Sequence, residues 1–130
     1  MATNKAELNK ELTRALHQYG ADYGFAITEK SIVKLIEAEV FDEIHLNSCG
    51  GKLLAEALMK SGKVLEQSDD EKSYIAVVRA GVANMNYALL ALKLDGEDIS
   101  IAAVAKEGLI KQGTAKGAVE KVIRNLCEKQ

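Results

Sequence analysis

The sequence predicts an all-α fold, namely a compact single-domain bundle of five or six helices over residues 1–130, packed around a central apolar helix at about 69–93. Three observations support this prediction. The 130 residues include no proline, which is the residue that most strongly breaks helices. Apolar residues recur at intervals of three and four along several segments, as they do on one face of a helix. Glycines mark the breaks between these segments.

Composition narrows the class of protein further. A chain of 130 residues that is 48% apolar, with a formal net charge of −2, fits one globular domain and not a disordered chain. No apolar run reaches the roughly 18 residues that a membrane-spanning helix needs, and the polar N-terminus does not resemble a signal peptide. Two cysteines, Cys49 and Cys127, are too few for a disulfide framework. We therefore expect a cytoplasmic protein with reduced thiols.

The first predicted helix begins at Asn4, which is a good N-cap, and Glu7 completes a capping box. It ends at Gly20, since glycine is the preferred residue just after a helix. Its apolar residues form one stripe, which consists of Leu8, Leu12, Ala15, Leu16 and Tyr19.

A second helix is predicted after Thr28, whose side chain can cap the amides near Ser31. Its apolar positions continue to Ile44, but acidic residues crowd the later half and oppose the helix macrodipole there. The break at 45–51 separates it from a third helix. The third helix has one apolar side, made of Leu53, Leu54, Ala57, Leu58, Ser61 and Leu65.

The central helix is predicted from a start signal and a long apolar seam. Ser68 and Glu71 form a capping box, with Asp69 and Asp70 in the positively polarised first turn. The seam then steps by three and four residues, through Ile75, Val78, Val82, Met85, Leu89 and Leu92. After a turn at 95–98, we expect a short helix at 101–107 and a last helix after Thr114.

The leading functional hypothesis is a small helical module that acts by protein–protein interaction, as a regulatory or adaptor protein that binds a partner or a second copy of itself. No set of nucleophile, base and metal ligands stands out, and six aromatic residues are too few to line a typical cofactor pocket. We therefore expect no catalysis, cofactor, metal or membrane association. The interface candidates are the seam residues Ile75, Val78, Val82, Met85, Leu89 and Leu92.

A second hypothesis is nucleic-acid binding through the C-terminal stretch at about 101–126, which loosely resembles a helix-turn-helix unit with Gly113 in the turn. The resemblance implies a recognition helix in the major groove. That helix would present Lys116, Lys121 and Arg124 to the phosphates. Residues 99–130 carry six basic and three acidic side chains, a local charge of +3.

A third hypothesis places an anion or thiol site at a helix N-terminus. The amides there attract anions and lower the pKa of a nearby cysteine. The residues concerned are Ser48, Cys49, Gly50, Gly51 and Lys52.

Overall fold

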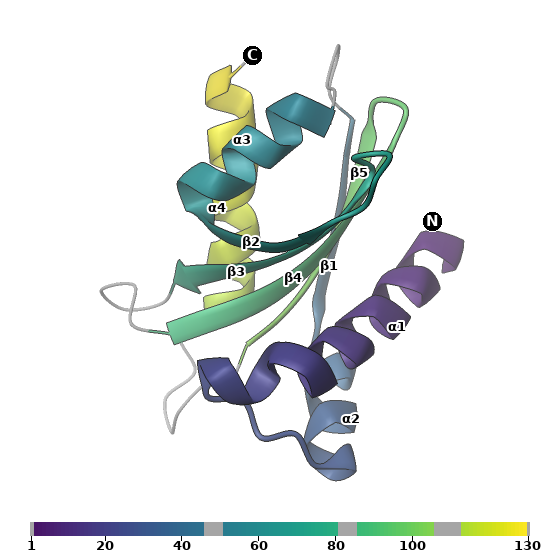
Figure 1. The fold of residues 1–130 in the computed structure, drawn as a ribbon, viewed down its shortest axis with the longest axis vertical. Helices are drawn as coiled ribbons and strands as arrows, with labels where there is room; N and C mark the ends of the chain where they lie inside the picture. Colours follow the sequence, from purple (N-terminus) through teal and green to yellow (C-terminus); the bar gives the residue numbers. More distant parts are fainter. Residues whose placement is uncertain (1, 46–50, 81–85, 106–112, 130) are drawn as a thin grey trace.

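The computed structural model describes residues 2–45, 51–80, 86–105 and 113–129, and it shows an α/β fold in three layers (Figure 1). The predicted all-α bundle is therefore wrong. In chain order the elements are α1 (Ala2–Tyr19), the 3-10 helix η1 (Gly20–Tyr23), α2 (Glu29–Glu37), β1 (Val40–His45), α3 (Gly51–Ser61), β2 (Gly62–Gln67), β3 (Ser73–Ala80), β4 (Asn86–Asp95), β5 (Asp98–Ala105) and α4 (Thr114–Lys129).

The described strands form one antiparallel sheet in the order β1-β5-β4-β3-β2. Strands β2 to β5 follow one another as neighbours, while β1 pairs with β5 at the far edge. Helix α3 therefore connects the two edge strands, β1 and β2. The register of β1 with β5 runs from Val40 opposite Ala103 to His45 opposite Asp98.

Helices cover both faces of the sheet (Figure 1). On one face α3 and α4 pack on the even-numbered side chains of β3 and β4, such as Val78 and Leu90. On the other face α1, η1 and α2 pack on the odd-numbered ones, such as Val77 and Leu89. Each face thus has its own apolar core, and the inner strands are buried on both sides.

The central helix predicted over 69–93 is wrong: residues 73–80 belong to β3 and residues 86–93 to β4, while 81–85 lie outside the described residues. Five consecutive residues of β3, from 74 to 78, are buried, and so are five of β4, from 88 to 92. A strand buried on both faces is apolar without alternation, and such a run cannot be told from a buried helix by periodicity alone. Because nearly every residue in these two runs is apolar, a helix-like spacing of three and four residues can be found in them although they are strands.

The expected capping box at Ser68 is part of a hairpin loop. The Ser68 hydroxyl accepts from the amides of Lys72 (3.2 Å) and Ser73 (3.0 Å), and Glu71 adopts a positive φ of 59°. Serine and aspartate favour helix N-caps and turns for the same reason, because their side chains bond nearby backbone amides. The Ser68 side chain thus bonds nearby backbone amides as predicted, but it does so in a loop between two strands and not at the start of a helix.

The short helix predicted at 101–107 is wrong in its described residues, and the second predicted helix is wrong beyond Glu37. Residues 101–105 belong to β5, so the described beginning of the helix-turn-helix-like unit is a strand, and residues 106–112 lie outside the described residues. Residues 40–44 belong to β1, which follows the end of α2 at Glu37. Two of the acidic residues that oppose a helix there, Asp42 and Glu43, lie in β1.

Four predicted helices are confirmed over part or most of their length, as α1, α2, α3 and α4. Helix α1 ends at Tyr19, next to Gly20, and Thr28 caps α2 by accepting from the Ser31 amide at 3.2 Å. Helix α3 carries the predicted stripe as far as Ser61, and α4 begins at Thr114. The buried Asn125 amide donates to the Ser61 hydroxyl at 2.7 Å and links α4 to α3. Among the described residues, no helix is both long enough and apolar enough to cross a bilayer.

The junction between α3 and β2 depends on a glycine. Gly62 follows the last residue of α3 directly, and a Cβ atom built on it would lie 2.1 Å from the backbone oxygen of Val77. No side chain fits at that distance, so any other residue would push β2 away from β3. Glycine is needed here for close backbone approach.

We predict that Gly62→Ala lowers the free energy of unfolding by roughly 3 kcal/mol, because the strand pair must shift to admit the methyl group. Urea unfolding followed by circular dichroism measures the change. Gly117→Ala in α4 is the matched control, since its Cβ would meet Ala80 at an ordinary 3.7 Å. That control should stabilise the protein slightly through helix propensity. Equal urea midpoints for Gly62→Ala and the wild type would contradict the close approach.

Candidate functional site

A groove of about 570 Å³ lies between α1 and the β2 side of the sheet. Glu7, Lys10, Glu11 and Arg14 of α1 form one wall. The other wall comes from the end of β2, the β2–β3 loop and the facing parts of β3 and β4. The groove exists because α1 packs mainly over β4 and β5, so the β2 side of this face is less covered.

Arg14 joins the two walls of the groove. Its Nη1 and Nη2 donate to the two carboxylate oxygens of Glu66 at 3.0 and 2.7 Å. Its Nε and Nη2 also donate to Glu11, and Nη1 donates to Gln18. All five N–H groups of the guanidinium therefore have an acceptor. Tyr19 donates a further hydrogen bond, at 2.5 Å, to Glu66.

These contacts shift the ionisation of the groups involved. The guanidinium of Arg14 lowers the pKa of Glu66, and the Glu66 carboxylate raises the pKa of Tyr19. At the β4 side of the groove, Glu7 lies 2.5 Å from the Nζ of Lys93 and raises the pKa of that lysine. The groove is therefore lined by ion pairs that hold α1 to β2 and β4.

Strand β2 forms one edge of the sheet beside this groove. Within the described residues its outer edge pairs with no other strand, and Val64, Leu65 and Glu66 are only partly buried. The register slips between Val64 and Glu66, so Leu65 is an extra residue, a β-bulge. An open edge with half-exposed apolar side chains is a ready template for a further strand.

A cluster of one histidine and two acidic residues, His45, Glu97 and Asp98, lies at the opposite edge of the sheet. The Nδ1 of His45 is 2.6 Å from Asp98, its cross-strand neighbour, and its Nε2 is 3.4 Å from Glu97. The hydrogen bond to Asp98 raises the pKa of His45 above 6.5. The cluster is exposed and links β1 to the β4–β5 loop. Among the described residues there is no group of three or more metal-binding side chains.

Glu39 is a buried carboxylate between α2 and β1. Its side chain is 4% exposed and lies 3.9 Å from the Nζ of Lys5. Burial raises the pKa of Glu39, while Lys5 and the side-chain hydrogen bond with Asn9 oppose the rise. The group connects α1 to the α2–β1 junction.

The predicted interface residues lie elsewhere. Ile75, Val78, Leu89 and Leu92 are at most 3% exposed and belong to the two cores. Their side chains pack within the chain itself and are not on the surface. Val82 and Met85 lie outside the described residues.

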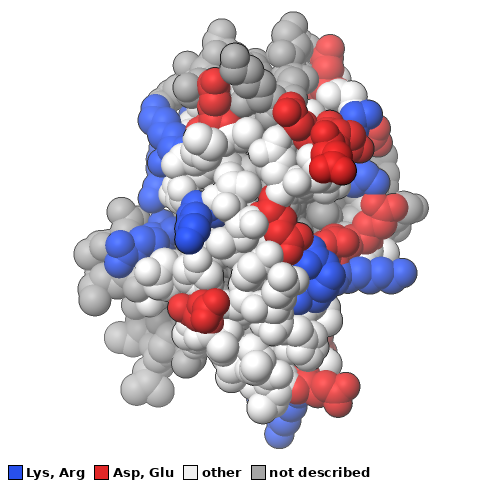
Figure 2. All heavy atoms as spheres, viewed as in Figure 1, with Lys and Arg blue, Asp and Glu red and all other residues white. Residues whose placement is uncertain are grey.

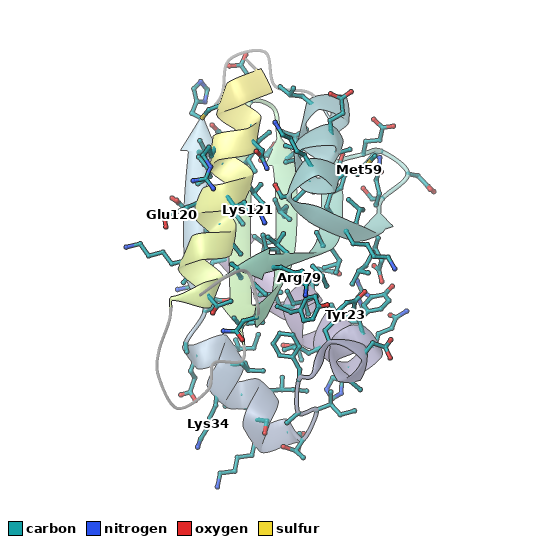
Figure 3. All side chains as sticks on the ribbon, turned by 90° about the vertical axis from the view of Figure 1, so that its left-hand side faces the viewer. Tyr23, Lys34, Met59, Arg79, Glu120 and Lys121 are labelled. Atoms are coloured by element: carbon teal, nitrogen blue, oxygen red, sulfur yellow. The ribbon has the colours of Figure 1, made fainter. Side chains whose placement is uncertain are left out.

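The predicted nucleic-acid-binding residues all lie on α4 but do not form a uniform basic stripe. Lys116 and Arg124 are exposed, and the acidic Glu120 stands between them at a spacing of four residues on each side. Lys121 turns toward the sheet, where its Nζ donates to the Arg79 carbonyl at 3.2 Å (Figure 3).

The predicted anion or thiol site lies mostly outside the described residues, which exclude Ser48, Cys49 and Gly50. Gly51 is the first residue of α3 and Lys52 the second. The helix start that the sequence predicts is thus found at Gly51, and Cys49 lies outside the described residues.

The sequence pattern does not indicate the groove or the β2 edge, because Leu65 continues the apolar stripe of the predicted third helix. A strand signal was present: Gly62 and the Ser68–Asp70 turn bound a short run that contains Val64 and Leu65. Leu65 instead completed the apolar stripe of the third helix.

Comparison with protein-family models, with curated proteins and with solved structures finds no match to this chain.

We predict that Arg14→Ala lowers the free energy of unfolding by about 1 kcal/mol at pH 7, the value of a well-formed but partly exposed ion pair. The folded-state pKa of Glu66 is lowered, so its contribution is complete above about pH 4.5 and is lost as the pH falls through the folded value. Urea midpoints at pH 7 and pH 3 measure both effects. An Arg14→Ala deficit that is the same at both pH values would contradict the ion pair.

We predict that the His45 ring titrates above 6.5 in an NMR titration and that Asp98→Asn lowers its pKa, because Asp98 is the main cause of the rise. Glu97→Gln serves as the control and should lower it less. Since the folded pKa is raised, this contact stabilises the fold below pH 6.5 and the benefit is lost as the pH rises through the folded value. A titration unchanged by Asp98→Asn would refute the contact.

Proposed function

We propose that this chain is a protein-interaction module that docks an extended segment of a partner against the outer edge of β2. The observation that carries the proposal is the unpaired outer edge of β2 among the described residues, with the partly exposed apolar side chains of Val64 and Leu65 at its centre. A strand added to such an edge gains main-chain hydrogen bonds, and the alternating side chains supply specificity.

The surroundings of β2 support this proposal because they hold the strand in place before any partner binds. Arg14 and Tyr19 fix Glu66 from the α1 side, and β3 pairs with the inner edge. A prearranged edge loses little conformational entropy on binding. The bulge at Leu65 gives the edge an irregular shape that a matching segment must accommodate.

Surface charge supports a protein partner more than a nucleic acid. Acidic and basic side chains are mixed on the face that Figure 2 shows, and no large surface of one sign is visible there. Nucleic-acid binding depends on a basic surface that neutralises several phosphates, whereas the whole chain carries a net charge of −2. We propose a cytoplasmic location, because two isolated cysteines do not form the disulfide framework that is typical of small secreted domains.

The proposal is tested by affinity capture with the tagged protein from an extract of the cells that naturally produce it, followed by quantitative mass spectrometry. Val64→Lys places a charge at the centre of β2 and should prevent strand addition. Met59→Lys on α3 is the matched control, since Met59 is 66% exposed and lies outside the edge. We expect the wild type and Met59→Lys to capture the same proteins and Val64→Lys to lose them.

Capture of the same proteins in equal amounts by folded Val64→Lys would contradict the proposal. Circular dichroism and the urea midpoint establish that the variant is folded. The untagged chain itself is counted among the proteins that the bait can capture.

A further inference from the structure

We infer that the segment docked on β2 is β2 of a second copy of this chain, paired antiparallel about a two-fold axis at Val64. This inference rests on the proposed function and names its partner. In such a pair Val64 faces Val64 of the other copy, and Gly62 faces its Gln67. Lys63 then faces the bulged position of the other copy, which holds Leu65 and Glu66.

The bulge is what makes this register consistent. Two residues that face each other across an antiparallel pair must lie on the same side of the sheet. Lys63 is opposite Val77 and Glu66 is opposite Ile75, and both of these β3 residues face α1. Lys63 and Glu66 therefore share a face, although a regular strand would put them on opposite faces.

The charges in this register are complementary. Each copy contributes one Lys63 and one Glu66, so the two-fold axis generates two identical lysine–glutamate contacts. Glu66 already accepts hydrogen bonds from Arg14 and Tyr19, and Glu11 is the other carboxylate bonded to Arg14. Because two carboxylates surround one guanidinium, Lys63 of the other copy meets a net negative charge. Opposite charges across a strand pair stabilise it and like charges destabilise it.

Strand β1, at the other edge of the sheet, has no register in which its charges are complementary over most of its length. Strand β1 is regular over Val40–His45, so a two-fold axis must pass through one of its residues. The two registers that overlap most of the strand place Asp42 opposite Asp42, or Glu43 opposite Glu43. Both bring like charges together, which opposes pairing. Of the two edges of the described sheet, β2 is therefore the one whose charges favour self-pairing.

The first test is the solution mass as a function of protein concentration and salt, by light scattering and analytical ultracentrifugation. We expect the wild type to approach twice the 14.1 kDa of the chain and to dissociate more readily in high salt. Lys63→Glu should raise the dissociation constant roughly tenfold or more, since both contacts become repulsive. Lys30→Glu on α2 changes the net charge equally and should leave the dimer intact.

A mixing experiment makes the test specific to this pair of residues. At a concentration just above the dissociation constant of the wild type, Lys63→Glu alone and Glu66→Lys alone should each be mainly monomeric, because like charges face each other. An equimolar mixture should form a heterodimer, since both contacts are then between opposite charges. A mixture that stays monomeric, with both variants folded, would contradict the register.

Disulfide trapping tests the position of the axis without depending on charge. In a chain with Cys49→Ser and Cys127→Ser, Val64→Cys brings two thiols face to face within the distance a disulfide allows. We expect rapid formation of a covalent dimer under mild oxidation. Lys63→Cys is the control and should cross-link slowly, because Lys63 of one copy does not face Lys63 of the other.

The outcomes separate this inference from the proposed function. A wild type that remains monomeric, while capture of another protein still depends on Val64, would overturn self-pairing and leave the docking edge in place. A dimer that is unaffected by Lys63→Glu and not trapped by Val64→Cys would show that a different surface associates. Loss of both capture and dimerisation in Val64→Lys, with the predicted mixing and trapping, supports the inference.

Discussion

The inner strands of the sheet, β3, β4 and β5, are covered by helices on both faces, and the rest of the molecule depends on this double burial. Helices α1 and α2 lie on one face and α3 and α4 on the other. Burial of apolar surface is the main favourable contribution to folding, and here it comes from both sides of one sheet. The close approach at Gly62 is a direct consequence, because α3 must leave one face and continue at once into an edge strand.

A sheet covered on both faces still has two edges, and the chain treats them differently. Strand β1 carries two adjacent acids, Asp42 and Glu43, and its end is occupied by the His45–Asp98 pair. Strand β2 carries Val64 and Leu65 at its centre and is held from α1 by Arg14. Self-pairing of β1 would place like charges opposite each other, which disfavours it. Self-pairing of β2 would place Lys63 opposite Glu66, which favours it. The same physical rule thus separates β1 from the edge at which we propose that a second copy docks.

Four helices could be predicted from the sequence because each has one buried stripe and a polar side, as in α1 with Leu8, Leu12 and Leu16. The strands could not, since residues 74–78 and 88–92 are buried on both faces and lose the alternation that identifies a strand. The candidate site depends on contacts between distant residues. Arg14 and Glu66 are 52 positions apart, and only the topology shows that β2 is an edge. Its bulge, which brings Lys63 and Glu66 to one face, follows from pairing with β3.

The central claim is that the outer edge of β2 is an interaction surface between two copies. Hydrogen–deuterium exchange of the amides of 62–67, measured at high and low protein concentration, tests it most directly. The account predicts that part of these amides exchange slowly in concentrated solution and faster on dilution, while those of β1 show no dependence on concentration. Exchange in β2 that is independent of concentration, across the range in which the solution mass changes, would contradict it.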